Sequence, residues 1–189
     1  MPGLAYRRLS DAIQEDPLWE AHQLGVGDVA GTLTLSVSNA DVFSSFKPIT
    51  ALGAKSEHAQ QAHTVDVNVV RLDSYLERLP DLGATYLKID TQGFEMEVLR
   101  GTGDHLNRMS AVQAELGLIK TYMNEDDWLD VLLWMRGRGF EIATAICNSA
   151  IWPEAQVREF DFVFVQRQKD QAASKVSAII PPSGTSAAA

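Results

Sequence analysis

The sequence predicts an α/β fold with a largely parallel sheet, and three observations carry that prediction. Strand-like and helix-like patterns alternate along the chain, which is typical of βαβ units. The run Thr85–Asp90 is almost continuously apolar, the pattern of a central strand covered on both faces. Phe140–Ile146 and Glu159–Gln166 both have strand patterns and are joined by a loop, so we expect an antiparallel pair at one side of the sheet.

The first third of the chain predicts one helix, two strands and a long loop. Leu4–Glu15 spaces its apolar residues as on one helix face, and Pro17 ends the pattern. Trp19–Val26 is an expected strand, and Gly31–Val37 alternates apolar and polar residues as a half-buried strand does. Residues 38–63 are polar and predict a loop of a length that is usually functional or mobile.

The middle of the chain predicts short elements with recognisable ends. In chain order, these are a strand marked by Val65, Val67 and Val69, a helix over Ser74–Arg78 capped by Asp73, the strand Thr85–Asp90, a helix over Phe94–Arg100 ended by Gly101, a strand over Ala111–Leu116, and a helix capped by Asn124 and ended by Gly139.

Composition narrows the classes of function. The 189 residues are enough for one domain, and a net charge of −9 disfavours binding to nucleic acid or to an anionic membrane. The single cysteine, Cys147, excludes a disulfide framework and is expected to be a buried strand thiol. With no apolar run of about 18 residues and no signal peptide, a cytoplasmic protein is expected. The domain is expected over residues 1–168, followed by a disordered tail over residues 169–189 that is rich in Ala, Ser, Pro and Lys.

The segment YLKIDTQGFEMEVLRG carries the candidate site. Lys88 and Asp90 lie on the same side of a strand because they are two residues apart, and Glu95 follows one turn into the next helix. Glu115 ends the next strand. Ligands of open α/β sheets bind beyond the carboxyl ends of the strands, where these side chains would converge. A purely structural role, as a Lys88–Asp90 ion pair and a helix-dipole partner at Glu95, explains the pattern equally well.

A second motif, GVGDVAG over residues 25–31, resembles a nucleotide-binding loop. Such a loop should open a helix, but the strand pattern TLTLSV follows it, so a hairpin turn is the favoured interpretation. A nucleotide-binding protein of another class remains an alternative, which predicts a helix over residues 32–37. The four histidines have no metal-ligand spacing.

Together, these segments resemble the FkbM-type methyltransferases over about residues 2–166. The resemblance rests on VVRLDSYL, YLKIDTQGFEMEVLRG and AVQAELGLIKTYM. The family pattern has Leu-Asp before a short helix, then Lys-Ile-Asp-x-Glu/Gln-Gly-x-Glu, then Val-Leu-x-Gly. The matching residues are Leu72-Asp73, Lys88-Ile89-Asp90, Gln92-Gly93, Glu95 and Val98-Leu99-Arg100-Gly101. Upstream, LGVGDVAGTLTLSVSNADVFSSF resembles the family's stretch after its third strand.

The resemblance implies an S-adenosylmethionine-dependent O-methyltransferase with a class I, Rossmann-like fold, acting on a hydroxyl of a sugar or a secondary metabolite. It implies catalytic roles for Asp90, Glu95, Lys88 and Glu115, with Asp90 the preferred base, and cofactor contacts for Asp28, Ser44 and Ser45. A divalent metal held by Asp90 and Glu115 is compatible with it, but the sequence assigns no metal site.

The chain also departs from the family pattern. The family's first strand, Gly-rich cofactor loop and second strand have no counterpart, and Met1-Pro2 falls where an acidic residue and a proline end the second strand. We therefore expect a sheet without these two strands and with an exposed edge open to self-association. A non-catalytic remnant or interaction module of the same fold is the alternative function.

Overall fold

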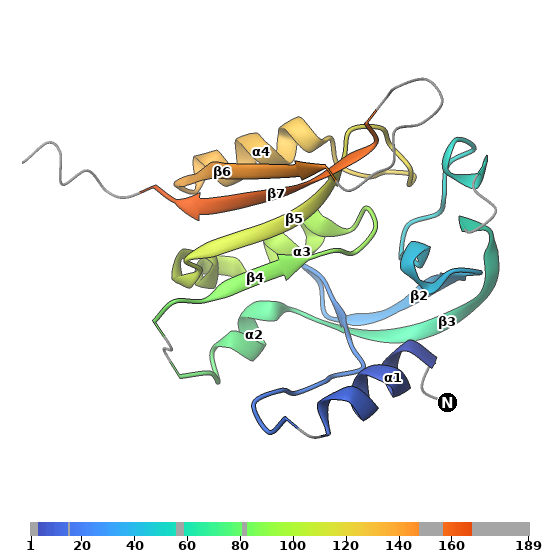
Figure 1. Cartoon of the computed structure of the whole chain (residues 1–189), viewed down its shortest axis with the longest axis horizontal. Coiled ribbons are helices and arrows are strands. Elements are labelled where there is room, and N and C mark those ends of the chain that lie inside the picture. The colour runs from blue at the N-terminus through green and yellow to red at the C-terminus, as the bar shows by residue number, and fades with distance from the viewer. Residues whose placement is uncertain (1–3, 15, 56–58, 81–82, 148–156, 168–189) are drawn as a thin grey trace, which may run out of the picture.

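Two β-sheets organise the chain (Figure 1). The computed structural model describes residues 4–14, 16–55, 59–80, 83–147 and 157–167. The three-stranded sheet has the order β1-β3-β2 and consists of β1 (Gly25–Val26), β2 (Gly31–Ser38) and β3 (Gln61–Val70). The four-stranded sheet has the order β4-β5-β7-β6 and consists of β4 (Tyr86–Ile89), β5 (Ala111–Gly117), β6 (Phe140–Cys147) and β7 (Glu159–Gln166).

Helices connect and cover these strands. The α-helices are α1 (Leu4–Ile13), α2 (Leu72–Leu76), α3 (Glu95–Gly101) and α4 (Trp128–Gly137). The 3-10 helices are η1 (Asp41–Phe43), η2 (Gly53–Lys55) and η4 (Gly103–Arg108). Within the described ranges, no helix combines the length and the apolar character that crossing a membrane requires. The predicted tail over residues 169–189 lies outside the described residues.

The α/β class is confirmed, but the prediction of a largely parallel sheet is wrong. Among the described strands, only β1–β3 and β4–β5 are parallel pairs, while β2–β3, β5–β7 and β6–β7 are antiparallel. The expected antiparallel pair of the last two strands is present as β6 and β7. The sequence pattern of alternating elements did not reveal that β2 and β3 form a long antiparallel ladder of their own, from Gly31↔Val69 to Val37↔His63.

The GVGDVAG segment is a crossing connection. β1 and β2 lie on opposite sides of β3, so the predicted hairpin is wrong. The strand expected over Trp19–Val26 shortens to two residues, because only Gly25 and Val26 pair with β3. β2 begins directly after the segment, which contradicts the helix that a nucleotide-binding loop requires.

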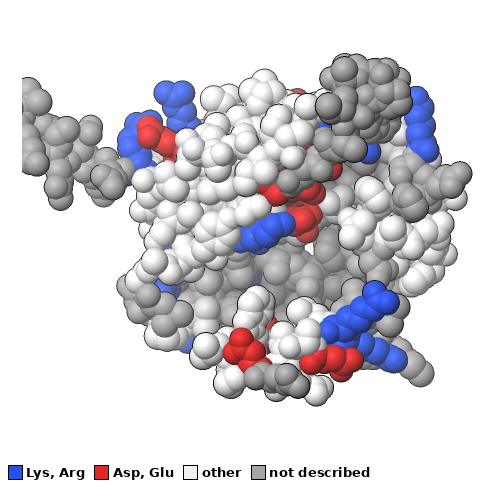
Figure 2. All heavy atoms as spheres, viewed as in Figure 1, with Lys and Arg blue, Asp and Glu red and all other residues white. Residues whose placement is uncertain are grey.

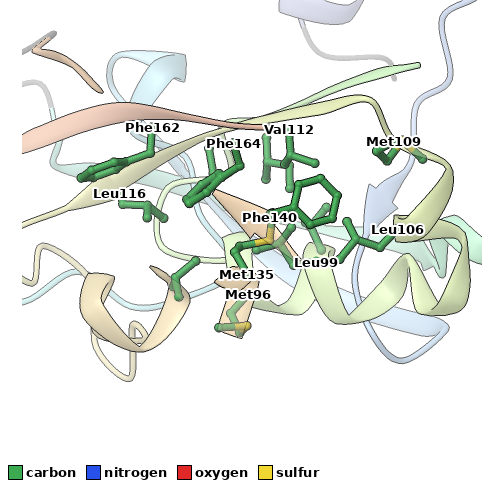
Figure 3. Packing of buried hydrophobic residues seen from close by; sticks show 14 of the residues in the cluster. Met96, Leu99, Leu106, Met109, Val112, Leu116, Met135, Phe140, Phe162 and Phe164 are labelled. Carbon is green, nitrogen blue, oxygen red and sulfur yellow. The ribbon is translucent and has the colours of Figure 1, made fainter. Parts of the chain in front are cut away.

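The hydrophobic core lies on one face of the four-stranded sheet (Figure 3). Val112, Ala114 and Leu116 alternate along β5 and are buried beneath the helices. Their partners come from α3, η4, α4 and the neighbouring strands, and include Met96, Leu99, Leu106, Met135, Phe140 and Phe164. Fully burying one such side chain contributes roughly 1.5–3 kcal/mol. This packing holds α3 and α4 against the sheet and so fixes the loops at the carboxyl ends of β4 and β5.

The opposite face of β4 is open, so the predicted cover on both faces is wrong. β4 is an edge strand that pairs only with β5 among the described strands. Tyr86 is 55% exposed, and Lys88 is also exposed on that face, whereas Ile89 points into the core. Cys147 at the end of β6 is likewise exposed rather than buried.

Several helix ends differ from the prediction. α4 begins at Trp128, and its N-cap is Asp127, whose Oδ1 accepts a hydrogen bond from the Leu129 N–H at 3.0 Å. The predicted cap Asn124 instead has a positive φ of 57° in the preceding loop. α2 begins at Leu72 with Arg71 as its N-cap, so Asp73 lies in the first turn. Gly139, with φ of 83°, follows α4 as expected.

Gly101 lies inside α3 rather than after it. Its importance is the close approach of two backbones, because a Cβ atom at position 101 would overlap the carbonyl oxygen of Gly27. Phe94, at the N-terminus of α3, closes the same region, since a Cβ atom on Gly27 would lie 3.1 Å from its ring. These contacts join the connection after β1 to the helix that leads away from β4.

Candidate functional site

The chain makes a tight turn after β4, and Glu95 holds it in shape. Gln92 and Gly93 both have positive φ values, 55° and 88°. Glu95 Oε1 accepts hydrogen bonds from the Thr91 N–H at 3.0 Å, the Gly93 N–H at 3.1 Å and Thr91 Oγ1 at 3.2 Å. Glu95 is 6% exposed, and burial raises its pKa to about 7. The carboxyl group predicted to be catalytic therefore has three backbone and hydroxyl donors from its own turn.

Gln92 joins the acidic residues of the site. Its Nε2 donates to Asp90 Oδ1 at 3.1 Å and to Glu115 Oε2 at 2.9 Å, while its Oε1 accepts from the Tyr122 hydroxyl at 2.9 Å. An ionised carboxylate only accepts hydrogen bonds, so the amide NH₂ must face the two acids. The Gln92 carbonyl oxygen accepts from Ser45 Oγ at 2.7 Å, which fixes the backbone below the amide.

Asp90 is the ionised member of the acidic group. Lys88 Nζ lies 3.0 Å from Asp90 Oδ2 and forms an ion pair with it. Burial acts to raise the pKa of Asp90, but the hydrogen bonds from Lys88 and Gln92 outweigh it and leave the pKa below its usual value. The bond to Asp90 also raises the pKa of Lys88, against the opposing effect of burial. Both groups are therefore charged at neutral pH.

Glu115 holds its proton more tightly. Burial raises its pKa to about 7, and the nearby carboxylates of Asp90, Glu159 and Asp161 act in the same direction. Asp161 is opposite Glu115 in the β5–β7 ladder. The pKa of Asp90 is thus lowered and that of Glu115 is raised. Near neutral pH, Asp90 is therefore ionised while Glu115 can take up or release a proton.

A second carboxylate-held turn follows β5. Glu125 Oε2 accepts from the Thr121 and Tyr122 N–H groups, both at 3.0 Å, and burial raises its pKa. The turn places Tyr122, which is 4% exposed, against the first turn. The Tyr122 hydroxyl contacts both Gln92 Oε1 and the Phe43 carbonyl oxygen, the latter at 3.2 Å. Burial raises the pKa of this phenol, so it remains a neutral donor.

A cleft opens between these two turns. Its lining includes Gln92, Glu95, Glu115, Tyr122, Glu125, Arg158 and Glu159. Figure 2 shows acidic side chains and a basic one gathered around a hollow near the middle of this face, over the ends of the strands in Figure 1. The arrangement can accept a proton at Glu115, which lines the cleft.

The predicted residues separate into two groups. Lys88, Asp90 and Glu115 come together as expected, and Glu95 lines the cleft beside them. Ser45 also lies at the site, through its bond to Gln92.

Asp28 and Ser44 do not join this group through any described bond. The Asp28 carbonyl oxygen accepts from Arg71 Nη1, and Arg71 is held by an ion pair with Asp73. Ser44 Oγ accepts from the Ser38 N–H at 3.3 Å. Of the three residues expected to contact the cofactor, only Ser45 is bonded to the site among the described residues.

Sequence reasoning missed Gln92, Tyr122, Glu125, Glu159 and Asp161 as parts of the site. Gln92 was recognised as a matching residue of the motif but was given no role in the site. The signal for Asp161 was a charged residue alternating with Phe160 and Phe162 on an apolar strand. Tyr122 and Glu125 gave no comparable signal, because their positions depend on how the loop after β5 turns.

The glycines near β1 do not form a cofactor cradle. A Cβ atom on Gly25 would overlap the Phe46 ring and Val69, and one on Gly27 would press against Phe94 and Val69. These glycines make room for protein side chains and not for a ligand. The cofactor contacts expected of Asp28, Ser44 and Ser45 stay a prediction. Within the described ranges, no group of three or more His, Cys, Asp or Glu side chains is placed to hold a metal ion.

Comparison with known proteins identifies the class. The model of the methyltransferase FkbM domain matches residues 6–142, and the chain belongs to the FkbM methyltransferase family. It is similar to "Methyltransferase 1" of Beauveria bassiana (strain ARSEF 2860), with 29% identity over 136 residues, which cover 66% of this chain and 53% of that protein. The chain thus spans about half the length of this curated relative. No solved structure matches.

Proposed function

We propose that the protein transfers a methyl group from S-adenosylmethionine to a hydroxyl oxygen, and that Glu115 accepts the hydroxyl proton. Membership of the FkbM family supports methyl transfer. The observation that carries the assignment of Glu115 is its place in the wall of the cleft, where Gln92 Nε2 donates to it at 2.9 Å and also to Asp90 at 3.1 Å. A general base works best when its pKa is near the working pH, and the Glu115 pKa of about 7 meets that condition.

The remaining residues position this base. Asp90 was the base expected from the sequence, but its two oxygens are engaged by Lys88 and Gln92, and its lowered pKa makes it a weaker proton acceptor. Asp90 instead favours the protonated form of Glu115 once a proton has been received. Gln92 keeps the two acids at a fixed separation, and Glu95 shapes the turn that carries Gln92. S-adenosylmethionine would supply the methyl group, and the residues above act on the acceptor.

The test compares Glu115→Gln with Glu77→Gln, whose side chain is 69% exposed and outside the cleft. Methyl transfer from labelled S-adenosylmethionine is measured with a panel of sugars and phenols, and cofactor binding is measured by calorimetry. We expect Glu115→Gln to lower kcat by roughly 10²–10⁴-fold, the usual contribution of a general base, without weakening cofactor binding. Full activity of Glu115→Gln between pH 6 and 8 would contradict the assignment, and absence of cofactor binding by the folded wild type would contradict the proposed function itself.

A further inference from the structure

Gln92 can hold the acidic pair only while its side-chain amide faces one way. Its NH₂ group donates to both Asp90 and Glu115, and its Oε1 accepts from the Tyr122 hydroxyl at 2.9 Å. Turning the amide over would point Oε1 at the two carboxyl groups and break both of these bonds. The group that fixes Oε1 therefore decides whether the pair is held.

The backbone of Gln92 is already fixed by other contacts. It has a left-handed φ of 55°, and its carbonyl oxygen accepts from Ser45 Oγ at 2.7 Å. The next residue, Gly93, is buried and has a φ of 88°. What remains to be set is the direction of the amide at the end of the Gln92 side chain, and the Tyr122 hydroxyl bonds to it there.

Tyr122 is itself held firmly in front of this amide. It is buried, and its N–H donates to Glu125 Oε2 at 3.0 Å. Its ring packs against the turn that carries Gln92, because a Cβ atom on Gly93 would lie 3.0 Å from Tyr122 Cβ and Cδ2. Burial raises the pKa of the Tyr122 phenol, so its hydroxyl keeps the hydrogen that it donates.

We propose that Tyr122 is a positioning residue, which acts through Gln92 to keep a hydrogen-bond donor on the carboxyl group of Glu115. The proposal rests on the proposed function, because Glu115 is the group that would take the proton from the acceptor. A hydrogen bond to an ionised carboxylate favours the ionised form. Without the Tyr122 hydroxyl, the amide can turn away from the pair, and Glu115 should then bind its proton more tightly.

The substitution Tyr122→Phe isolates this effect, because it leaves every charged group near Glu115 unchanged. These groups are Lys88, Asp90, Glu95, Glu125, Arg158, Glu159 and Asp161. Phenylalanine also keeps an aromatic ring against Gly93. A change in the titration of Glu115 can therefore be assigned to the hydrogen bonds of Gln92.

The experiment follows the carboxyl carbon of Glu115 by NMR during a pH titration of the full chain, with ¹³C-labelled glutamate. Glu115→Gln identifies the signal by removing it. We expect Tyr122→Phe to raise the titration midpoint by roughly 0.5 pH or more, which is about threefold tighter proton binding. Tyr86→Phe is the matched control, because the Tyr86 hydroxyl also donates to a glutamine Oε1, that of Gln113 outside the cleft. It should leave the midpoint where it is in the wild type.

A second variant tests whether the effect passes through Gln92. Gln92→Gly removes the amide and suits the left-handed backbone. It should raise the Glu115 midpoint as Tyr122→Phe does, and the double variant should raise it no further, because both changes remove the same support.

Three outcomes would overturn the proposal: an unchanged midpoint in Tyr122→Phe, an equal rise in Tyr86→Phe, or a further rise in the double variant. If Tyr122→Phe does not fold, an unchanged midpoint in Gln92→Gly overturns it as well.

The NMR titration does not depend on methyl transfer, so the failure of this proposal is distinguishable from the failure of the proposed function. A midpoint that rises in Tyr122→Phe, in a protein that transfers no methyl group, supports the positioning role and denies the activity. Methyl transfer by a protein whose Glu115 midpoint is the same in the wild type and in Tyr122→Phe supports the activity and denies the positioning role.

Discussion

The turns after β4 and β5 are held in shape in the same way, but the residues around them differ. Each turn is held by a buried glutamate that accepts hydrogen bonds from backbone N–H groups a few residues before it, and each includes a residue with positive φ. Glu95 has two such donors in its own turn and a third from the Thr91 hydroxyl, and it is pushed toward the neutral form by burial and by Glu125. Glu125 has two donors, and Lys47 and Lys120 partly offset the effect of its burial. The same turn-holding device thus gives one carboxyl group that titrates near neutrality and another that nearby cations keep closer to its ordinary range.

The largest expected difference between the turns comes from removing each carboxylate. Glu95→Ala removes three hydrogen bonds to a buried turn and should lower the free energy of unfolding by about 3 kcal/mol, at about 1 kcal/mol per bond. Glu125→Ala removes two and should cost about 2 kcal/mol. Urea unfolding at pH 7 measures both, with the exposed Glu77→Ala as control. Equal losses of unfolding free energy in Glu95→Ala and Glu125→Ala would contradict this difference between the turns.

A smaller expected difference between the turns lies in how each glutamate makes the free energy of unfolding depend on pH. The folded-state pKa of Glu95 lies near 7 and above its ordinary value, so the folded protein binds more protons than the unfolded chain between about pH 4.5 and 7. Its contribution is therefore fully present at low pH and is lost as the pH rises from about 4.5 through 7, by up to about 1.4 kcal/mol per pH unit. Glu95→Gln should remove this part of the slope, and Glu125→Gln should remove less. Unfolding free energies at pH 5, 6, 7 and 8 give the answer, and an unchanged slope in Glu95→Gln would refute the raised pKa.

The smallest effect concerns the left-handed residue of the second turn. Asn124 has φ of 57°, a conformation that asparagine tolerates and glycine adopts freely. Asn124→Gly should therefore change the unfolding free energy by no more than about 0.5 kcal/mol. Asn124→Ala should cost about 1 kcal/mol or more, because alanine adopts the left-handed conformation less readily than asparagine does. Thermal unfolding of both variants checks this. A stabilised Asn124→Ala variant would contradict the left-handed conformation.

The two turns also show what the sequence could predict. The turn after β4 follows an apolar strand directly and contains Gly93, so its place, the nearby helix and the meeting of Lys88, Asp90 and Glu115 were all predictable. In the turn after β5, Asn124 followed by three acidic residues looks like a helix start, but the chain delays the helix until Asp127 caps it. The local pattern favoured Asn124 as the cap. In the structure, Glu125 instead accepts hydrogen bonds from the backbone of Thr121 and Tyr122, so the helix begins later.

Long-range pairing was beyond the sequence. Nothing in Gly31–Ser38 or in the valines of β3 shows that these segments form a ladder separate from the four-stranded sheet. The pattern of a buried strand at β4 was correct for Leu87 and Ile89, which pack in the core, but wrong for the face that carries Tyr86 and Lys88. The cofactor roles of Asp28 and Ser44 came from resemblance alone, and their hydrogen bonds to Arg71 and Ser38 could not be inferred from spacing.

Tyr122 has one hydroxyl hydrogen and two acceptors within reach, the Phe43 carbonyl oxygen and Gln92 Oε1. The hydrogen can bond to only one of these oxygens at a time. When it bonds to Phe43, Gln92 loses one of the contacts that orient its amide, whose Nε2 donates to both Asp90 and Glu115. How firmly the acidic pair is held thus depends on the position of a single hydrogen atom on Tyr122.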